Sequence, residues 1–175
     1  TLHPRVHGGI LARDQAADWA DLARIGGKPI DLVCVNLYPF EATVAGGADH
    51  PTIIENIDIG GPSMVRSAAK NHARVLVVTD PGDYGDVLAA IAAGADEGLR
   101  ARLAAKAFGH TAAYDGAIAG YLTALDGEGG RHTFPGTLTT VLEKAYDTRY
   151  GENPHQKGAF YLERGAPEGS LARTE

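Results

Sequence analysis

The chain has almost no cysteine: Cys34 is the only one in 175 residues. A single cysteine excludes an internal disulfide and any zinc site built from cysteines. Because Cys34 lies within the uninterrupted apolar run of residues 32–35, we expect a buried and unreactive thiol.

Positive charge is also scarce, with 16 Lys and Arg against 22 Asp and Glu and a net charge of −6. Non-specific binding of nucleic acid needs a basic face, so nucleic acid is not expected as a partner. Long apolar runs are missing as well, and none approaches the roughly 18–20 residues of a membrane span. The composition therefore predicts a soluble protein with no membrane partner.

Glycine, by contrast, is plentiful, and its 23 residues often stand in pairs between segments of regular apolar spacing. This arrangement is typical of a chain that alternates helices and strands. Two uninterrupted apolar runs, 30–37 and 74–79, predict strands of a parallel sheet that are buried on both faces. Helices are predicted at 15–25 with Asp14 as cap, from Thr52 in a capping box, at 62–72, from Asp80 onward and at 96–123.

The stretch from Asp58 to His72 combines the residue types that acid–base chemistry needs. Asp58 precedes a helix start, where free backbone N–H groups form a site for an anion or a carbonyl oxygen. Arg66 and Lys70 are four residues apart and share one helix face. Helical side chains lean toward the N-terminus, so we expect the Lys70 amine to approach Asp58. The alternative is a solvated Lys/Arg face with an ordinary loop aspartate.

A second candidate site follows the first predicted strand, where Asn36 and Tyr38 stand just past its carboxyl end. Ligands of open α/β sheets bind at this edge. The alternative is that Tyr38 packs under a loop together with Phe40. His3 and His7 are four residues apart, but Pro4 stands where a zinc protease motif needs Glu, so no metal site is predicted.

Five strings, in this order, resemble one family. They are TLHPxVHxGILAR at 1–13, NLYPF at 36–40, IDIGG at 57–61, RxAAKNH at 66–72 and RYGENPHQ at 149–156. Together they resemble the bifunctional purine biosynthesis family, which joins IMP cyclohydrolase to AICAR formyltransferase. The resemblance extends over nearly the whole chain.

The resemblance implies an α/β fold with a three-layer parallel sheet, like that of methylglyoxal synthase. It implies a cyclohydrolase domain at residues 1–140 and the start of a transferase domain at 141–175. It also implies an N-terminal truncation, because the family's phosphate-binding strand, its loop and the Lys before the residue that matches Thr1 are not in the sequence. We expect the 175-residue chain alone to be inactive.

The reaction implied for the first domain is the closure of formyl-AICAR to IMP with loss of water, and it needs no cofactor or metal. The transferase domain formylates AICAR with 10-formyltetrahydrofolate. The resemblance also implies a cytoplasmic homodimer whose ligands are small nucleotides. The resemblance assigns proton transfer to Lys70, with Arg66 beside it, and binding of the carboxamide to Asp58. It places Tyr38 over the ring, Val35 and Asn36 at the edge of the base, and Ile59 and Gly60 at the oxyanion. It assigns Thr1 to the phosphate cradle, and Arg149 and Tyr150 to the binding of AICAR.

Two other functions remain open at this point. One is a non-catalytic nucleotide-sensing module of the same fold, which would not need the pair Asp58 and Lys70. The other is methylglyoxal synthase itself, which the string at 149–156 disfavours.

Overall fold

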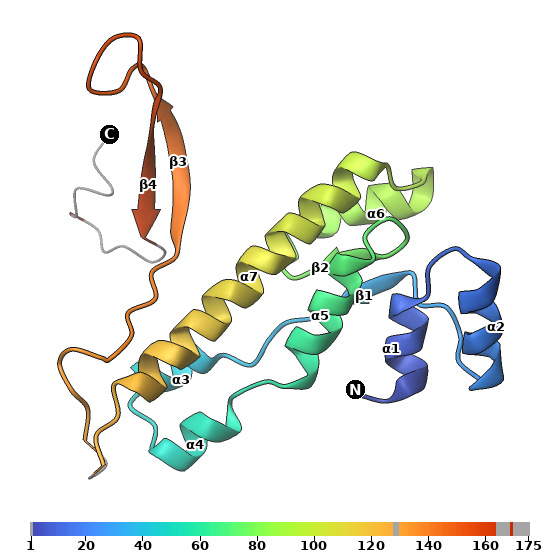
Figure 1. Ribbon diagram of the computed structural model, residues 1–175, viewed down its shortest axis with the longest axis horizontal. Helices are drawn as coiled ribbons and strands as arrows, with labels where there is room; N and C mark the ends of the chain where they lie inside the picture. Colours follow the sequence, from blue (N-terminus) through green and yellow to red (C-terminus); the bar gives the residue numbers. More distant parts are fainter. Residues whose placement is uncertain (1, 128–129, 164–168, 170–175) are drawn as a thin grey trace. The chain divides into compact units, whose positions relative to one another are not determined.

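The computed structural model describes residues 2–127, 130–163 and 169. The chain forms two compact units, Thr1–Asp115 and Gly116–Glu175, and Figure 1 shows the elements of both. The boundary between the units falls inside the longest helix, α7 (Glu97–Thr123). It reflects packing alone, so the functional boundary at 140/141 stays a prediction.

A parallel pair of strands forms the sheet of the first unit, as the apolar runs predict. Strand β1 (Leu32–Cys34) pairs with β2 (Leu76–Val78), and Val33 lies opposite Val77. All three residues of β2 are buried, whereas β1 alternates exposed, buried and exposed. Successive side chains of a strand point to opposite faces, so only one face of β1 packs on the core. The prediction of a buried Cys34 is therefore wrong, because its side chain is on the exposed face.

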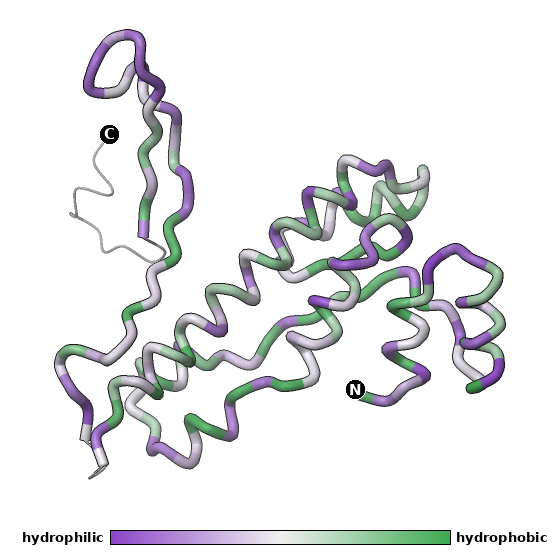
Figure 2. Tube along the Cα trace, in the orientation of Figure 1, coloured by the Kyte–Doolittle hydropathy of each residue, from purple (hydrophilic) through white to green (hydrophobic). Residues whose placement is uncertain are grey.

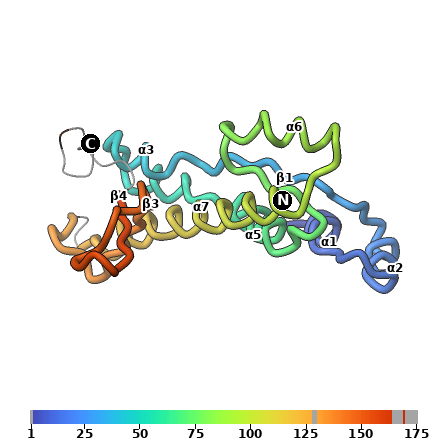
Figure 3. Tube along the Cα trace, turned by 90° about the horizontal axis from the view of Figure 1, so that it is seen from above, coloured from blue at the N-terminus to red at the C-terminus, as the bar shows by residue number. Residues whose placement is uncertain are grey.

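Helices surround these strands. The first unit contains α1 (Pro4–Leu11), α2 (Ala16–Arg24), α3 (Phe40–Ala45), α4 (His50–Glu55), α5 (Gly60–Lys70), the 3-10 turn Pro81–Asp83, α6 (Tyr84–Ala93) and the first part of α7. Viewed from above, α6 lies on one side of β1 and α5 on the other (Figure 3). Hydrophobic residues follow both strands in Figure 2, and side chains of α1, α5, α6 and α7 join them in one core.

Helix starts are where the structure departs most from the predictions. Asp14 does not cap α2, since its carboxylate accepts a hydrogen bond from Trp19 Nε1 at 3.1 Å. Helix α4 begins at His50, two residues before Thr52, because Asp49 accepts from the Thr52 backbone N–H at 3.0 Å. Helix α5 also begins early, at Gly60 rather than Pro62. Only α4 has a different side chain as its cap; the N-cap residues of α2 and α5, Gln15 and Ile59, make no side-chain hydrogen bond to their helices.

The second unit holds the end of α7 and an antiparallel hairpin. The helix predicted at 96–123 is present as α7, which runs for 27 residues without a break at its glycines. Strand β3 (Leu142–Thr148) pairs with β4 (Gly158–Glu163). No strand is predicted at β3 from the sequence, because its residues are mostly polar and show no alternation. No helix among the described residues is both long enough and apolar enough to cross a membrane.

Candidate functional site

A pocket of about 420 Å³ opens at the carboxyl ends of β1 and β2. The loop after β1 forms one wall, Thr79 follows β2, and His110 and Tyr114 come from α7. Two of the predicted residues, Asn36 and Tyr38, line it. This is the edge of the sheet at which α/β proteins bind ligands.

The two aromatic residues of the loop after β1 behave differently. Phe40 is 2% exposed and packs edge-on against Tyr114, with ring centroids 6.3 Å apart. Tyr38, in contrast, is 54% exposed. The alternative in which Tyr38 packs under a loop together with Phe40 therefore does not describe this structure, and the Tyr38 hydroxyl is accessible to a ligand.

Asp58 is held in a tight turn directly before α5. Its Oδ1 accepts a hydrogen bond from the Gly61 backbone N–H at 2.8 Å. A Cβ on Gly61 would lie 2.5 Å from Asp58 Oδ2 and 2.9 Å from Leu37 Cδ2, so only glycine fits there without a shift. Among the described residues, the backbone N–H groups of Ile59 and Gly60 have no acceptor. The turn thus presents a fixed carboxylate beside two available donors.

Tyr114 connects this turn to the pocket wall. Its hydroxyl accepts from the Asp58 backbone N–H at 2.8 Å and donates to the Asn56 carbonyl at 3.1 Å. Burial raises the pKa of Tyr114 above its ordinary value. Thr79, His110 and Tyr114 are not among the site residues predicted from the sequence. The strand-end rule that found Asn36 also applies to Thr79 after β2.

Lys70 lies at the opposite end of α5 from Asp58. It is the last residue of the helix and is exposed, and ten residues of helix separate it from Gly60 by about 15 Å. Its amine makes no hydrogen bond or ion pair with any residue that the structure describes. Arg66, also exposed, places its guanidinium 5.5 Å from the centroid of the Phe108 ring. The predicted convergence of Lys70 with Asp58 is not seen, because a lysine stem is shorter than the helix between them.

Polar side chains just past Lys70 tie the end of α5 to α1. Asn71 Nδ2 donates to the carbonyls of Ile10 and Ala12 at 2.8 and 2.9 Å. Arg74 Nε donates to the Ala12 carbonyl at 2.8 Å, and its guanidinium also pairs with Asp31 at 2.6 Å. Arg74 was not predicted to matter, although it closely follows the string at 66–72.

The remaining predicted residues are not among those that line the pocket. Val35 follows β1, and its N–H donates to the Val78 carbonyl at 3.0 Å. Ile59 is exposed. Arg149 and Tyr150 follow β3 in the second unit, and Thr1 lies outside the described residues.

The two N-terminal histidines make separate contacts. His3 accepts a hydrogen bond from the Arg5 N–H, and His7 Nδ1 lies 3.3 Å from Ser67 Oγ. The described part of the chain contains no cluster of three His, Cys, Asp or Glu side chains suited to a metal.

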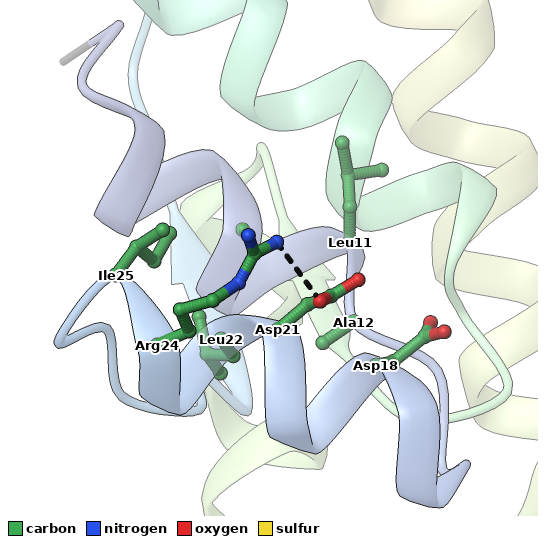
Figure 4. Close-up of a pocket in the computed structure, with 8 residues that line it drawn as sticks. Leu11, Ala12, Asp18, Asp21, Leu22, Arg24 and Ile25 are labelled. Atoms are coloured by element: carbon green, nitrogen blue, oxygen red, sulfur yellow. Dashed lines mark hydrogen bonds and ion pairs between the residues drawn. The ribbon is translucent and has the colours of Figure 1, made fainter.

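A second pocket, of about 280 Å³, lies between α1 and α2 (Figure 4). Asp21 and Arg24 form an exposed ion pair at its rim, with 3.0 Å between Oδ1 and Nη2. Hydrogen bonds from Arg13 lower the pKa of Asp18 to about 2. These carboxylates are already paired, and none of the predicted site residues lines this pocket, so we place the candidate site at the strand ends.

Comparisons with known proteins agree on one family. The family model described as "AICARFT/IMPCHase bienzyme" matches residues 68–175. The chain is 65% identical to the bifunctional purine biosynthesis protein PurH of Sorangium cellulosum (strain So ce56), over all of this chain and 35% of that protein. It is 54% identical to the PurH of Myxococcus xanthus (strain DK1622), over 96% of this chain and 32% of that protein. The chain thus spans about a third of the length of these curated relatives.

A solved structure is also similar. The crystal structure of ForH matches with a TM-score of 0.57 and 39% sequence identity, over 68% of this chain and 64% of that one. The match supports the mixed α/β architecture with a parallel sheet.

Proposed function

Because this chain belongs to the AICARFT/IMPCHase bienzyme family, we propose that residues 1–140 contribute an IMP cyclohydrolase domain and that 141–175 begin an AICAR formyltransferase domain. The cyclohydrolase part has the three-layer, methylglyoxal-synthase-like fold in this proposal. The family match does not favour the alternative of a nucleotide-sensing module.

The proposed reaction closes the second ring of a purine. The carboxamide nitrogen of formyl-AICAR attacks the neighbouring formyl carbon, a C–N bond forms, and the formyl oxygen leaves as water. The chemistry needs an acceptor for the amide proton, donors for the oxygen that gains charge, and a proton for the departing hydroxide. One observation carries the proposal: Tyr114, which lines the pocket at the strand ends, also holds the Asp58 turn, where a carboxylate stands beside two N–H groups that have no acceptor among the described residues.

Each group at the turn has a role suited to its geometry. The Asp58 carboxylate, held by the Gly61 N–H at 2.8 Å, orients and polarises the carboxamide. The N–H groups of Ile59 and Gly60 stabilise the oxyanion, since preorganised donors act where charge develops. Tyr38 lies over the ring, and Val35 and Asn36 meet the edge of the base.

Lys70 enters the proposal on the family resemblance, as the residue that transfers the proton, with Arg66 beside it. Its role rests on that resemblance alone, because α5 puts about 15 Å between Gly60 and Lys70.

The other parts of the proposal concern the natural protein as a whole. It is a cytoplasmic homodimer, Thr1 belongs to its phosphate cradle, and Arg149 and Tyr150 bind AICAR in the transferase site. 10-Formyltetrahydrofolate is the formyl donor there, a substrate of the transferase, while the ring closure uses no cofactor.

An assay of ring closure tests the function directly. The natural protein that contains this chain is given formyl-AICAR, and formation of IMP is followed by absorbance. We expect Asp58→Asn to lower kcat by about 10²–10⁴-fold, with a smaller effect on KM. The matched control Asp21→Asn changes an exposed carboxylate at the rim of the other pocket and should leave the rate unchanged. A wild-type protein that forms no IMP contradicts the proposal.

A further inference from the structure

We infer that Tyr114 is a positioning residue for the proposed cyclisation, which fixes the Asp58 turn and ties it to the wall of the pocket. This inference rests on the proposed function of that site. Tyr114 lies 56 positions beyond Asp58 in the chain, and none of the five strings that resemble the family contains it.

The two hydrogen bonds of the Tyr114 hydroxyl hold the turn from both sides. The hydroxyl accepts from the Asp58 N–H at 2.8 Å and donates to the carbonyl of Asn56 at 3.1 Å. One atom therefore bridges two backbone groups that flank Ile57. The direction of the peptide before Asp58 is set by this bridge, and with it the direction of the carboxylate.

The surroundings of Tyr114 keep its hydroxyl in place. The residue is 8% exposed, and its ring packs edge-on against Phe40. It belongs to the long helix α7, which runs alongside α5 in Figure 1. A ring fixed by a helix and by an aromatic contact loses little further freedom when its hydroxyl bonds to the turn.

Tyr114 also lines the pocket that contains Asn36 and Tyr38. The ring that holds the Asp58 turn is therefore part of the pocket wall. The hydroxyl can donate only one hydrogen bond, and it donates that bond to the Asn56 carbonyl. Tyr114 is thus occupied as a structural bridge and acts on the reaction through Asp58 rather than on the substrate itself.

A double-mutant cycle separates this role from a purely structural one. In the natural protein, Tyr114→Phe keeps the ring and removes the bridge, and we expect kcat to fall about tenfold or more while KM changes less than twofold, because small misplacements of a reacting group are costly. In an Asp58→Asn background the same change should cost less than twofold, because interacting residues are not additive. Tyr161→Phe, an exposed tyrosine of β4, is the matched control and should leave ring closure unchanged.

A second variant reaches the carboxylate without touching Tyr114. Gly61→Ala places a methyl group 2.5 Å from Asp58 Oδ2 and should lower kcat in the same way. It should likewise have little effect once Asp58 is Asn. This variant keeps the test decisive if Tyr114→Phe folds poorly.

Hydrogen exchange tests the bridge without any assay of activity. In Tyr114→Phe, the amide of Asp58 should exchange at least about tenfold faster than in the wild type, while amides of β2 stay unchanged. Equal exchange at Asp58, or losses in kcat that add fully in the double mutant, would overturn the inference. A wild-type protein that binds the pocket ligand but never closes the ring would instead overturn the proposed function.

Discussion

The two ends of helix α5 are built in opposite ways. At its start, Asp58 accepts from the Gly61 N–H, and the N–H groups of Ile59 and Gly60 have no acceptor among the described residues. Past its end, Asn71 and Arg74 donate to carbonyls of α1, and Arg74 also pairs with Asp31. The start of α5 thus keeps N–H groups without an acceptor among the described residues, whereas the polar side chains past its end are paired within the protein.

This difference predicts that the start of α5 matters for ligand binding and that its C-terminal end matters for the stability of the fold. Buried polar groups that are fully paired stabilise a fold, while donors without a protein partner are available for chemistry. Changes at the start of α5 should therefore alter activity, and changes just past its end should alter the free energy of unfolding. Lys70 is the exception, because it is the last residue of α5 and the family resemblance still gives it a catalytic role.

The largest expected effect comes from Lys70→Ala. In the natural protein, ring closure should fall by about 10²–10⁴-fold, as is typical for loss of a general acid or base, while formyl transfer stays nearly normal. The unfolding midpoint should not change, since the side chain is exposed and its amine has no partner among the described residues. Steady-state rates of both reactions measure this. Ring closure within threefold of the wild type would remove Lys70 from the mechanism and make the end of α5 purely structural.

Arg74→Ala should give the next largest effect, on stability. The Arg74 side chain is 13% exposed, and its loss removes its hydrogen bonds to the carbonyls of Ile10 and Ala12 together with its ion pair to Asp31. We expect the free energy of unfolding in urea to fall by about 3 kcal/mol, the upper range for a charged hydrogen-bonding group.

Arg24→Ala is the control for that measurement, because its ion pair with Asp21 is exposed and should contribute about 0.5 kcal/mol or less. Equal losses in the two variants would show that the contacts past the end of α5 do not anchor the helix.

The smallest effect concerns pH. Burial raises the pKa of Tyr114 above the ordinary value of 10.0. The unfolded state therefore loses its proton at a lower pH than the folded state, so this contribution to stability is complete below pH 10 and is lost as pH rises through the folded pKa. Melting temperatures between pH 8 and 11 should fall more steeply at the top of the range in the wild type than in Tyr114→Phe. Parallel curves would contradict the burial of this hydroxyl.

Much of the first unit could be predicted from local pattern. The apolar runs gave both strands and their parallel pairing, and regular apolar spacing gave α7 as one helix. The strand-end rule led to Asn36 and Tyr38, which both line the pocket. These features depend on residues that are close together in sequence.

The rest depends on contacts between distant residues. Nothing near Tyr114 in the sequence indicates that its hydroxyl bonds to Asp58, 56 positions away. The Lys70 amine was expected near Asp58 from the lean of helical side chains, but α5 begins at Gly60, so the full length of the helix lies between them. Cys34 was expected inside because its run is apolar, whereas burial depends on what covers each face of β1.

Hydrogen exchange with and without IMP tests the contrast between the two ends of α5 most directly. In the natural protein, saturating IMP should slow exchange in the segments 57–61 and 36–42 and leave 71–75 unchanged. Protection at 71–75 with none at 57–61 would contradict the account, because it would place the ligand at the C-terminal end of α5, where the polar side chains are paired within the protein.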